Sequence, residues 1–149
     1  MHMAAVRRAD ATWNGSLMDG KGMVNASSSG AFKQLPVSWA RRSEADAQGT
    51  TSPEEFLAAA HASCFAMALS HGLAQAGSPP EQLDVSAEVT FDQVGGGFKV
   101  TSSKLQVRGK VPGIDAAAFQ KAADAAKDGC PISGALKGNV DLSVNATLV

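Results

Sequence analysis

One long apolar segment with a marked beginning and end constrains the fold more than any other feature of this chain. The sequence SPEE at 52–55 supplies an N-cap serine, a proline suited to the first helical position and two carboxylates for the positive end of a helix. An apolar run over 56–73 follows and continues until Gly77, Pro79 and Pro80 stop it. The segment predicts a helix of roughly 35 Å, since each helical residue adds about 1.5 Å.

The middle of this segment, 58–69, is apolar or small on nearly every side, and its alanines allow another backbone to approach closely. A helix of this kind is buried all round or packed tightly against another helix. No apolar run approaches the roughly 20 residues of a membrane span, so we expect a central core helix, with a second subunit as one candidate partner, and no membrane association. Residues 1–8 lack the apolar core of a signal peptide, which predicts a cytoplasmic location.

Alternating apolar residues predict strands before and after this helix. The predicted strands cover 9–13, 18–26, 32–39, 83–91, 98–111 and 140–149. Asn14-Gly15 and the glycines at 95–97 are turn signals between them. Asp115 can cap a second helix, and Pro131 can begin a short third one. Without an internal repeat or a linker, the pattern indicates one α+β domain that covers 1–149.

The charge balance bears on the kinds of partner that the chain can have. Formal net charge is −1, with 13 basic and 14 acidic side chains. Because basic and acidic side chains nearly cancel, the protein has no broad positive field to attract nucleic acid. We therefore expect no nucleic-acid partner.

The chain has two cysteines, Cys64 and Cys130. Cytosolic thiols are normally kept reduced, so a disulfide in such a protein tends to be transient and catalytic or sensing. Cys64 lies within the apolar helix, where packing is the ordinary role of a cysteine and burial makes a thiol inert. Cys130 precedes Pro131 at the start of a short helix, where free backbone N–H groups favour a thiolate. From the residues alone, an inert pair and a reactive pair both stay open.

Reduction of a peroxide by a cysteine has three requirements. The sulfur must be a thiolate, a fixed cation must favour that thiolate, and a second thiol must trap the sulfenic acid. Arginine suits the second requirement because it stays charged and presents a planar fork of donors. Arg42 is the candidate cation, in a polar stretch over 41–51 that we expect to be a loop. Glu54, in the first turn of the long helix, is the candidate carboxylate that holds it.

Two segments of the chain resemble a known family. The sequence SPEEFLAAAHASCFAMAL at 52–69 is similar to the segment around the first cysteine of the OsmC/Ohr family of peroxide reductases, and DGCPIS at 128–133 is similar to the segment around the second. Shorter likenesses extend the resemblance over nearly the whole chain, at 20–22, 97–100 and 111–115. His61 and the run FAMAL at 65–69 resemble the osmotically inducible (OsmC) branch more than the organic hydroperoxide resistance (Ohr) branch.

The resemblance implies an OsmC-like α+β fold with antiparallel strands, a long central buried helix and an intertwined homodimer whose two active sites lie at the interface. It implies that Cys64 is the peroxidatic cysteine and Cys130 the resolving cysteine. Glu54 matches the family's active-site glutamate, and Arg42 matches the arginine that pairs with it. Arg41 is the neighbouring alternative, because this stretch is one residue longer than in typical members.

The implied function is a thiol-dependent peroxidase that reduces organic hydroperoxides, and hydrogen peroxide more weakly, in defence against oxidative and osmotic stress. A Cys64 sulfenic acid and then a Cys64–Cys130 disulfide form, and an external dithiol, of the lipoyl type by family likeness, reduces the disulfide. No cofactor is needed, and no metal is expected because no pair of candidate ligands has the short spacing of zinc sites. The alternative is a redox-sensing or small-apolar-ligand-binding member of the same fold. His61 is expected to be a packing or interface residue, with tuning of Cys64 as the other interpretation.

Overall fold

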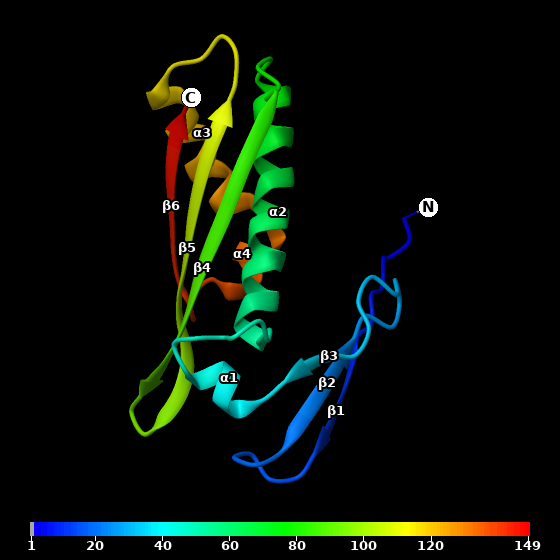
Figure 1. Ribbon diagram of the computed structural model, residues 1–149. Helices are drawn as coiled ribbons and strands as arrows, with labels where there is room; N and C mark the ends of the chain where they lie inside the picture. The colour runs from blue at the N-terminus through cyan, green and yellow to red at the C-terminus, as the bar shows by residue number, and fades with distance from the viewer. Residues whose placement is uncertain (1) are drawn as a thin grey trace. The chain divides into compact units, whose positions relative to one another are not determined.

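The computed structural model describes residues 2–149 and has the α+β class predicted from the sequence. Contacts within the chain divide it into two compact units, residues 1–53 and residues 54–149. The elements in chain order are β1 (Asp10–Asn14), β2 (Lys21–Asn25), β3 (Leu35–Val37), α1 (Trp39–Ser43), α2 (Pro53–Gln75), β4 (Gln82–Val94), β5 (Gly97–Lys110), α3 (Ala116–Gly129), α4 (Pro131–Leu136) and β6 (Asp141–Leu148) (Figure 1).

The first unit is built on a three-stranded antiparallel sheet in the order β1-β2-β3. Asp10 pairs with Asn25 at one end of the β1–β2 ladder, and Asn14 pairs with Lys21 at the other. Gly15 follows β1 with a φ of +96°, the left-handed region that glycine enters without strain. The three predicted strands and the turn signal of this region are therefore confirmed, although the strands are shorter than expected.

The polar stretch that was expected to be a loop begins with a short helix instead. α1 carries both Arg41 and Arg42, and the Ser38 hydroxyl caps it by accepting a hydrogen bond from the Arg41 backbone N–H at 3.3 Å. One helical turn is too short to show an apolar period, so the sequence pattern does not distinguish it from a loop. The capping hydrogen bond from Ser38 stabilises the turn as a helix.

The second unit contains the other sheet, in the order β4-β5-β6. β4 and β5 form a long antiparallel hairpin, and Gly95 and Gly96 make its turn with φ values of +58° and +84°. β6, however, runs parallel to β5, so the expectation of antiparallel strands is wrong for this pair. Parallel neighbours need a crossover connection, and α3 with α4 supplies it between β5 and β6 (Figure 1).

α2 begins at Pro53 as predicted and is buried along one stripe rather than all round. The buried apolar residues of α2 recur every fourth position, at Phe65, Leu69 and Leu73, and His61 extends the stripe by one turn. Residues four apart share one face of a helix, so this stripe faces the core. Met67, on another face, is 68% exposed. Of the two alternatives given by the sequence, burial all round does not hold for this chain taken by itself.

By length and composition alone α2 could cross a membrane, with a mean hydropathy of 1.3. The expectation that no apolar run approaches a membrane span is therefore wrong as a statement about length. The core helix of a soluble protein passes the same test, and α2 supplies three of the buried apolar residues of the second unit. α2 is therefore the core helix of the second unit.

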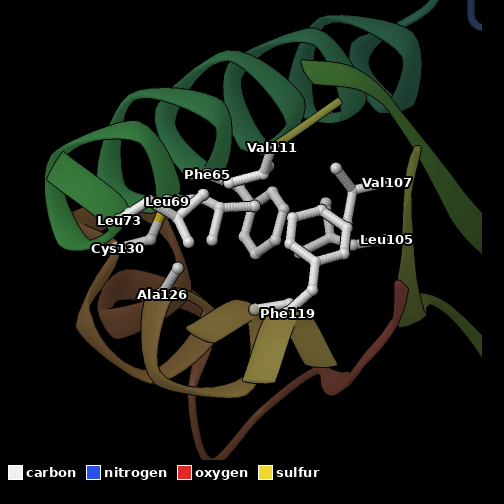
Figure 2. Close-up of a cluster of buried hydrophobic side chains, with 10 residues drawn as sticks. Phe65, Leu69, Leu73, Leu105, Val107, Val111, Phe119, Ala126 and Cys130 are labelled. Carbon is white, nitrogen blue, oxygen red and sulfur yellow. The ribbon is translucent and has the colours of Figure 1, made fainter. Parts of the chain in front are cut away.

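The core of the second unit lies between α2, α3 and the sheet (Figure 2). Phe65 from α2 and Phe119 from α3 are fully buried and point into this space, where Leu105 and Val107 of β5 meet them. Cys130 belongs to the same cluster and is 1% exposed. The packed core therefore holds one of the two sulfurs in place.

Gly109 of β5 provides space for a core ring. A Cβ at this position would overlap the Phe119 ring, so we expect Gly109→Ala to lower the free energy of unfolding by about 1–3 kcal/mol, as overpacking does. The control is Gly97→Ala in the same strand, where a Cβ would meet only the Val94 carbonyl oxygen at 4.0 Å. Urea unfolding followed by circular dichroism measures both. Equal stabilities of the two variants would contradict the close packing of Phe119 on Gly109.

Candidate active site

The two cysteines, which lie far apart in the sequence, meet in the second unit. Cys64 lies in the middle of α2, and Cys130 is the N-cap residue of α4. The two side chains lie close enough for each to shift the pKa of the other, and both are free thiols. The expectation that the two sulfurs lie within reach of each other is thus confirmed.

Cys130 is the more acidic thiol of the pair. Burial by itself raises the pKa of Cys130, but the neighbouring polar groups outweigh this effect and hold the pKa below its usual value. These groups are the Cys64 thiol, the backbone and hydroxyl of Ser133, and the backbone of Ile132. Cys130 is the N-cap residue of α4, although its side chain makes no capping hydrogen bond to that helix. The lowered pKa agrees in direction with the thiolate expected at Cys130.

Cys64 shows the opposite trend. Burial raises the pKa of the Cys64 thiol, and the hydrogen bond to Cys130 with the negative charge there raises it further. A backbone hydrogen bond from Ile132 acts in the other direction without reversing the shift. Of the two thiols, Cys64 is therefore the weaker acid. A Cys64 thiolate needs an additional cation, which is the role predicted for Arg42.

Solvent access distinguishes the two sulfurs. Cys64 is half-buried at the edge of the core stripe of α2, one position from the buried Phe65. Cys130 is 1% exposed and lies inside the core cluster. A molecule from solvent can approach the first sulfur and not the second. This order of access fits an attacking Cys64 and a Cys130 that acts afterwards.

A buried histidine lies next to the cysteine pair, and its polar partners were missed from the sequence. His61 is fully buried, with Nδ1 at 2.7 Å from the Ser103 hydroxyl of β5 and Nε2 at 2.8 Å from the Ser133 hydroxyl of α4. Desolvation by burial lowers the pKa of this imidazole, so it is neutral at physiological pH. Packing was the expected role of His61, and the structure adds two hydrogen bonds to it. No local pattern marks the serines, because each comes from a different element.

Glu54 lies in the first turn of α2 and is 8% exposed, which is unusual for a carboxylate. Ten positions separate it from Cys64, which amounts to roughly 15 Å along the helix axis. The carboxylate therefore cannot touch the sulfur, and any effect of Glu54 on Cys64 must pass through another side chain. Among residues 2–149 no three His, Cys, Asp or Glu side chains gather in a way that could hold a metal ion.

The two candidate arginines, both on α1 in the first unit, differ in their surroundings. The Arg41 guanidinium forms an ion pair with Glu44 at 3.3 Å within the same short segment. Arg42 lines a pocket of about 340 Å³ within the first unit. The other lining residues of that pocket are largely apolar: Trp13, Leu17, Val37, Ser38, Trp39 and Pro53. One guanidinium among apolar walls suits a molecule with a polar end and an alkyl body.

Comparison with known proteins identifies the family. Residues 45–145 match the family model described as OsmC-like protein. The protein named peroxiredoxin OsmC from Escherichia coli (strain K12) is 41% identical over 140 residues, which are 94% of this chain and 96% of that protein.

Solved structures agree with this match. The crystal structure of the organic hydroperoxide resistance protein OhrB of Bacillus subtilis covers 94% of this chain and 98% of its own, with a TM-score of 0.73 and 25% identity. An organic hydroperoxide resistance protein from Elizabethkingia anophelis has the same fold, with full coverage of both chains, a TM-score of 0.74 and 22% identity. With both cysteine segments present and the two cysteines close together, this chain belongs to the OsmC-like protein family, within the OsmC/Ohr group.

Proposed function

We propose that this protein is a thiol peroxidase that reduces organic hydroperoxides to alcohols, and hydrogen peroxide more weakly. The observation that carries the proposal is a half-buried thiol, Cys64, close to a buried thiol, Cys130, whose pKa is lowered. The relatives named for peroxide reduction and hydroperoxide resistance support the same activity. An accessible sulfur beside a second sulfur is what a two-cysteine redox cycle requires.

The proposed cycle uses each sulfur once. The Cys64 thiolate attacks the distal peroxide oxygen, so that the O–O bond breaks, the alkoxide leaves with a proton as alcohol, and Cys64 becomes a sulfenic acid. The Cys130 thiolate then attacks the Cys64 sulfur, the S–O bond breaks, and hydroxide leaves as the disulfide forms. An external dithiol transfers two electrons and two protons to restore both thiols.

The assignment of Arg42 and Glu54 to this cycle is part of the proposal. Arg42 lines the largely apolar pocket of the first unit, which favours it as the cation that lowers the pKa of Cys64 and polarises the peroxide. Glu54 is a buried carboxylate too far along α2 to act on Cys64 directly. A carboxylate of that kind holds a guanidinium in place, so Glu54 is assigned as a positioning residue for Arg42.

The pocket beside Arg42 supports organic hydroperoxides over hydrogen peroxide as substrates. Its walls include Trp13, Leu17 and Val37, and apolar side chains of this kind gain free energy by covering an alkyl or acyl chain. Hydrogen peroxide has no alkyl or acyl chain, so its binding gains free energy from polar interactions alone. The preference is therefore expected in KM as well as in kcat.

The remaining assignments follow the family resemblance. The subunits form an intertwined homodimer in the cytoplasm, residues 1–149 act as a single OsmC-like domain, and a dithiol of the lipoyl type is the reductant. The exposed side of α2, which includes Met67, supports a partner subunit there, because the helix is apolar on more sides than this chain alone buries. Sedimentation velocity measures the assembly. The physiological role assigned is defence against oxidative and osmotic stress.

Oxidation of the reduced protein tests the proposed function. One equivalent of cumene hydroperoxide is expected to form one Cys64–Cys130 bridge, seen by mass spectrometry as the loss of two hydrogens. With excess hydroperoxide and a lipoyl-type dithiol, each protein molecule is expected to produce many equivalents of alcohol. A redox sensor would stop after one equivalent, and two inert packing thiols would not oxidise at all. Either result would overturn the proposal.

A further inference from the structure

One buried histidine side chain links three elements of the second unit. Its imidazole forms a hydrogen bond at each nitrogen, with Nδ1 at 2.7 Å from the Ser103 hydroxyl of β5 and Nε2 at 2.8 Å from the Ser133 hydroxyl of α4. His61, Ser103 and Ser133 are each 2% exposed or less. Burying polar side chains is costly unless all are hydrogen bonded, and among residues 2–149 no buried side-chain nitrogen or oxygen lacks a partner. Because the three side chains are shielded from solvent, water does not compete for these two hydrogen bonds.

α4 is attached to the core by this polar contact more than by apolar burial. Among its six residues, all of which the structure describes, Ser133 is the one that is buried. Ile132 and Leu136 are half-buried, and the other residues of the helix are exposed. A helix of this length is not stable by itself, so its position depends on contacts with its neighbours. The hydrogen bond between Ser133 and His61 is therefore a principal attachment of α4.

The backbone of α4 joins Ser133 rigidly to Cys130. Cys130 is the N-cap residue of α4, and its carbonyl oxygen accepts a hydrogen bond from the Gly134 N–H at 3.0 Å. Its own N–H donates to the Ala126 carbonyl oxygen of α3 at 2.9 Å. These two bonds hold Cys130 to α3 and α4, and neither reaches α2, which carries the other cysteine. The side chain of Ser133, about one turn along α4 from Cys130, makes the hydrogen bond to α2.

The same spacing recurs on α2. His61 precedes Cys64 by three positions, about one turn, so the two residues project from neighbouring turns of one helix. Cys64 packs against the core cluster that contains Cys130. The His61–Ser133 hydrogen bond and the cysteine pair are thus two successive contacts between the same two segments, one turn apart. A fixed distance at the first contact restricts the distance at the second.

Ser103 fixes the imidazole from the opposite side. It lies in β5, the central strand of its sheet, where it pairs with Val89 of β4 and Leu142 of β6. Strands on both sides therefore hold this residue in place. An imidazole that is hydrogen bonded at both nitrogens cannot rotate without breaking one of the bonds. Ser103 thereby keeps the His61 ring directed toward Ser133.

We propose that His61 is a positioning residue for the redox pair: it holds the segment that carries Cys130 at a fixed distance from the helix that carries Cys64. Holding two groups in place in this way raises the effective concentration of one thiol at the other. The inference rests on the proposed function for its consequence, which is faster attack of the Cys130 thiolate on the Cys64 sulfenic acid. In that attack the S–S bond forms, the S–O bond breaks and hydroxide leaves. His61 exchanges no electron or proton in this step.

Equilibrium with glutathione measures the effective concentration of the thiol pair without any peroxide. The protein dithiol and oxidised glutathione give the protein disulfide and two molecules of reduced glutathione, and acid trapping with mass spectrometry gives their amounts. We expect Ser133→Ala and His61→Leu each to lower this equilibrium constant about tenfold, because the hydrogen bond that holds α4 to α2 is lost. Unchanged constants in both variants would overturn the inference.

Two amide substitutions separate the contact with Ser133 from the need for any polar group at this position. The Gln amide is one methylene further from the backbone than the Asn amide, so Gln reaches the place of Nε2 and Asn only that of Nδ1. His61→Gln is therefore expected to stay within about threefold of the parent constant, and His61→Asn to fall about tenfold, as His61→Leu does. Equal constants for His61→Gln and His61→Asn would contradict the role of the Ser133 contact.

Gly109→Ala is the control for a general loss of stability. It strains the same core at the Phe119 ring and changes neither hydrogen bond of His61, so we expect the constant to stay within about twofold of the parent. A decrease as large as that of Ser133→Ala would mean that any loosening of the core has this effect, and the inference would fail. Absent hydroperoxide turnover in the parent protein, with the expected shifts in the glutathione equilibrium, would count against the peroxidase cycle alone.

Discussion

Replacing Cys64 with serine is expected to lower hydroperoxide turnover by at least about a thousandfold, because the reacting group is a thiolate that a hydroxyl cannot replace. Cys64 is the half-buried sulfur of the pair, whereas Cys130 is 1% exposed and enclosed by the core. The measurement is stopped-flow consumption of cumene hydroperoxide in the presence of a dithiol. The fold of the variant is checked by circular dichroism, since serine is slightly smaller and still donates a hydrogen bond.

Cys130→Ser is the matched control, and it separates the roles of the two sulfurs. This variant is expected to consume one equivalent of hydroperoxide rapidly and then stop, with a sulfenic acid on Cys64 that a dimedone probe captures. The control is necessary because Cys130, rather than Cys64, has the lowered pKa within the second unit. If Cys130→Ser loses the first oxidation and Cys64→Ser keeps it, the peroxidatic and resolving roles are reversed.

Loss of the Arg42 guanidinium is the second change with a large expected effect. We expect Arg42→Ala to lower kcat/KM by about 10²–10³, the usual effect of deleting one electrostatic donor from an active site. The physical reason is that burial and the neighbouring Cys130 raise the pKa of Cys64, so that an added positive charge is needed to favour the thiolate. The rate that remains should increase toward higher pH, because the Cys64 thiolate then forms only as pH approaches its raised pKa.

Arg41→Ala is the control for this prediction. Arg41 differs from Arg42 by one position on α1 and is engaged with Glu44 at 3.3 Å, so its loss is expected to change kcat/KM by less than about threefold. Arg42→Lys keeps the charge without the planar fork and should fall between the two. A large loss for Arg41→Ala with little loss for Arg42→Ala would transfer the assignment to Arg41.

Local signals in the sequence predicted most elements of the second unit. Pro53 begins α2 as expected, and the Asp115 side chain caps α3 by accepting a hydrogen bond from the Ala118 N–H at 2.8 Å. Cys130 is the N-cap residue of α4, with Pro131 in the first turn. These features depend on a few neighbouring residues, and therefore the sequence alone carries them.

The direction of β6 and the burial of α2 were not predictable in the same way. The alternation of apolar and polar residues in a strand is the same whether the neighbouring strand is parallel or antiparallel. The sequence of 140–149 therefore does not indicate the direction of this strand relative to its neighbour. The apolar, alanine-rich surface of α2 is compatible with burial all round. Within one chain, however, the other elements of the second unit cover only the stripe that includes Phe65 and Leu69. How many sides of a helix are covered depends on the elements packed against it and not on the helix itself.

The sequence by itself determined the helix that carries Cys64, the helix start that carries Cys130, and the family to which both segments belong. Only the tertiary structure decided that the two sulfurs meet and that His61 joins Ser103 and Ser133, which lie 42 and 72 positions away along the chain. Helix starts and turns are set by interactions within a few residues. Hydrogen bonds between a strand and two helices exist only after the core has packed them together, because no local preference encodes distances between separate elements.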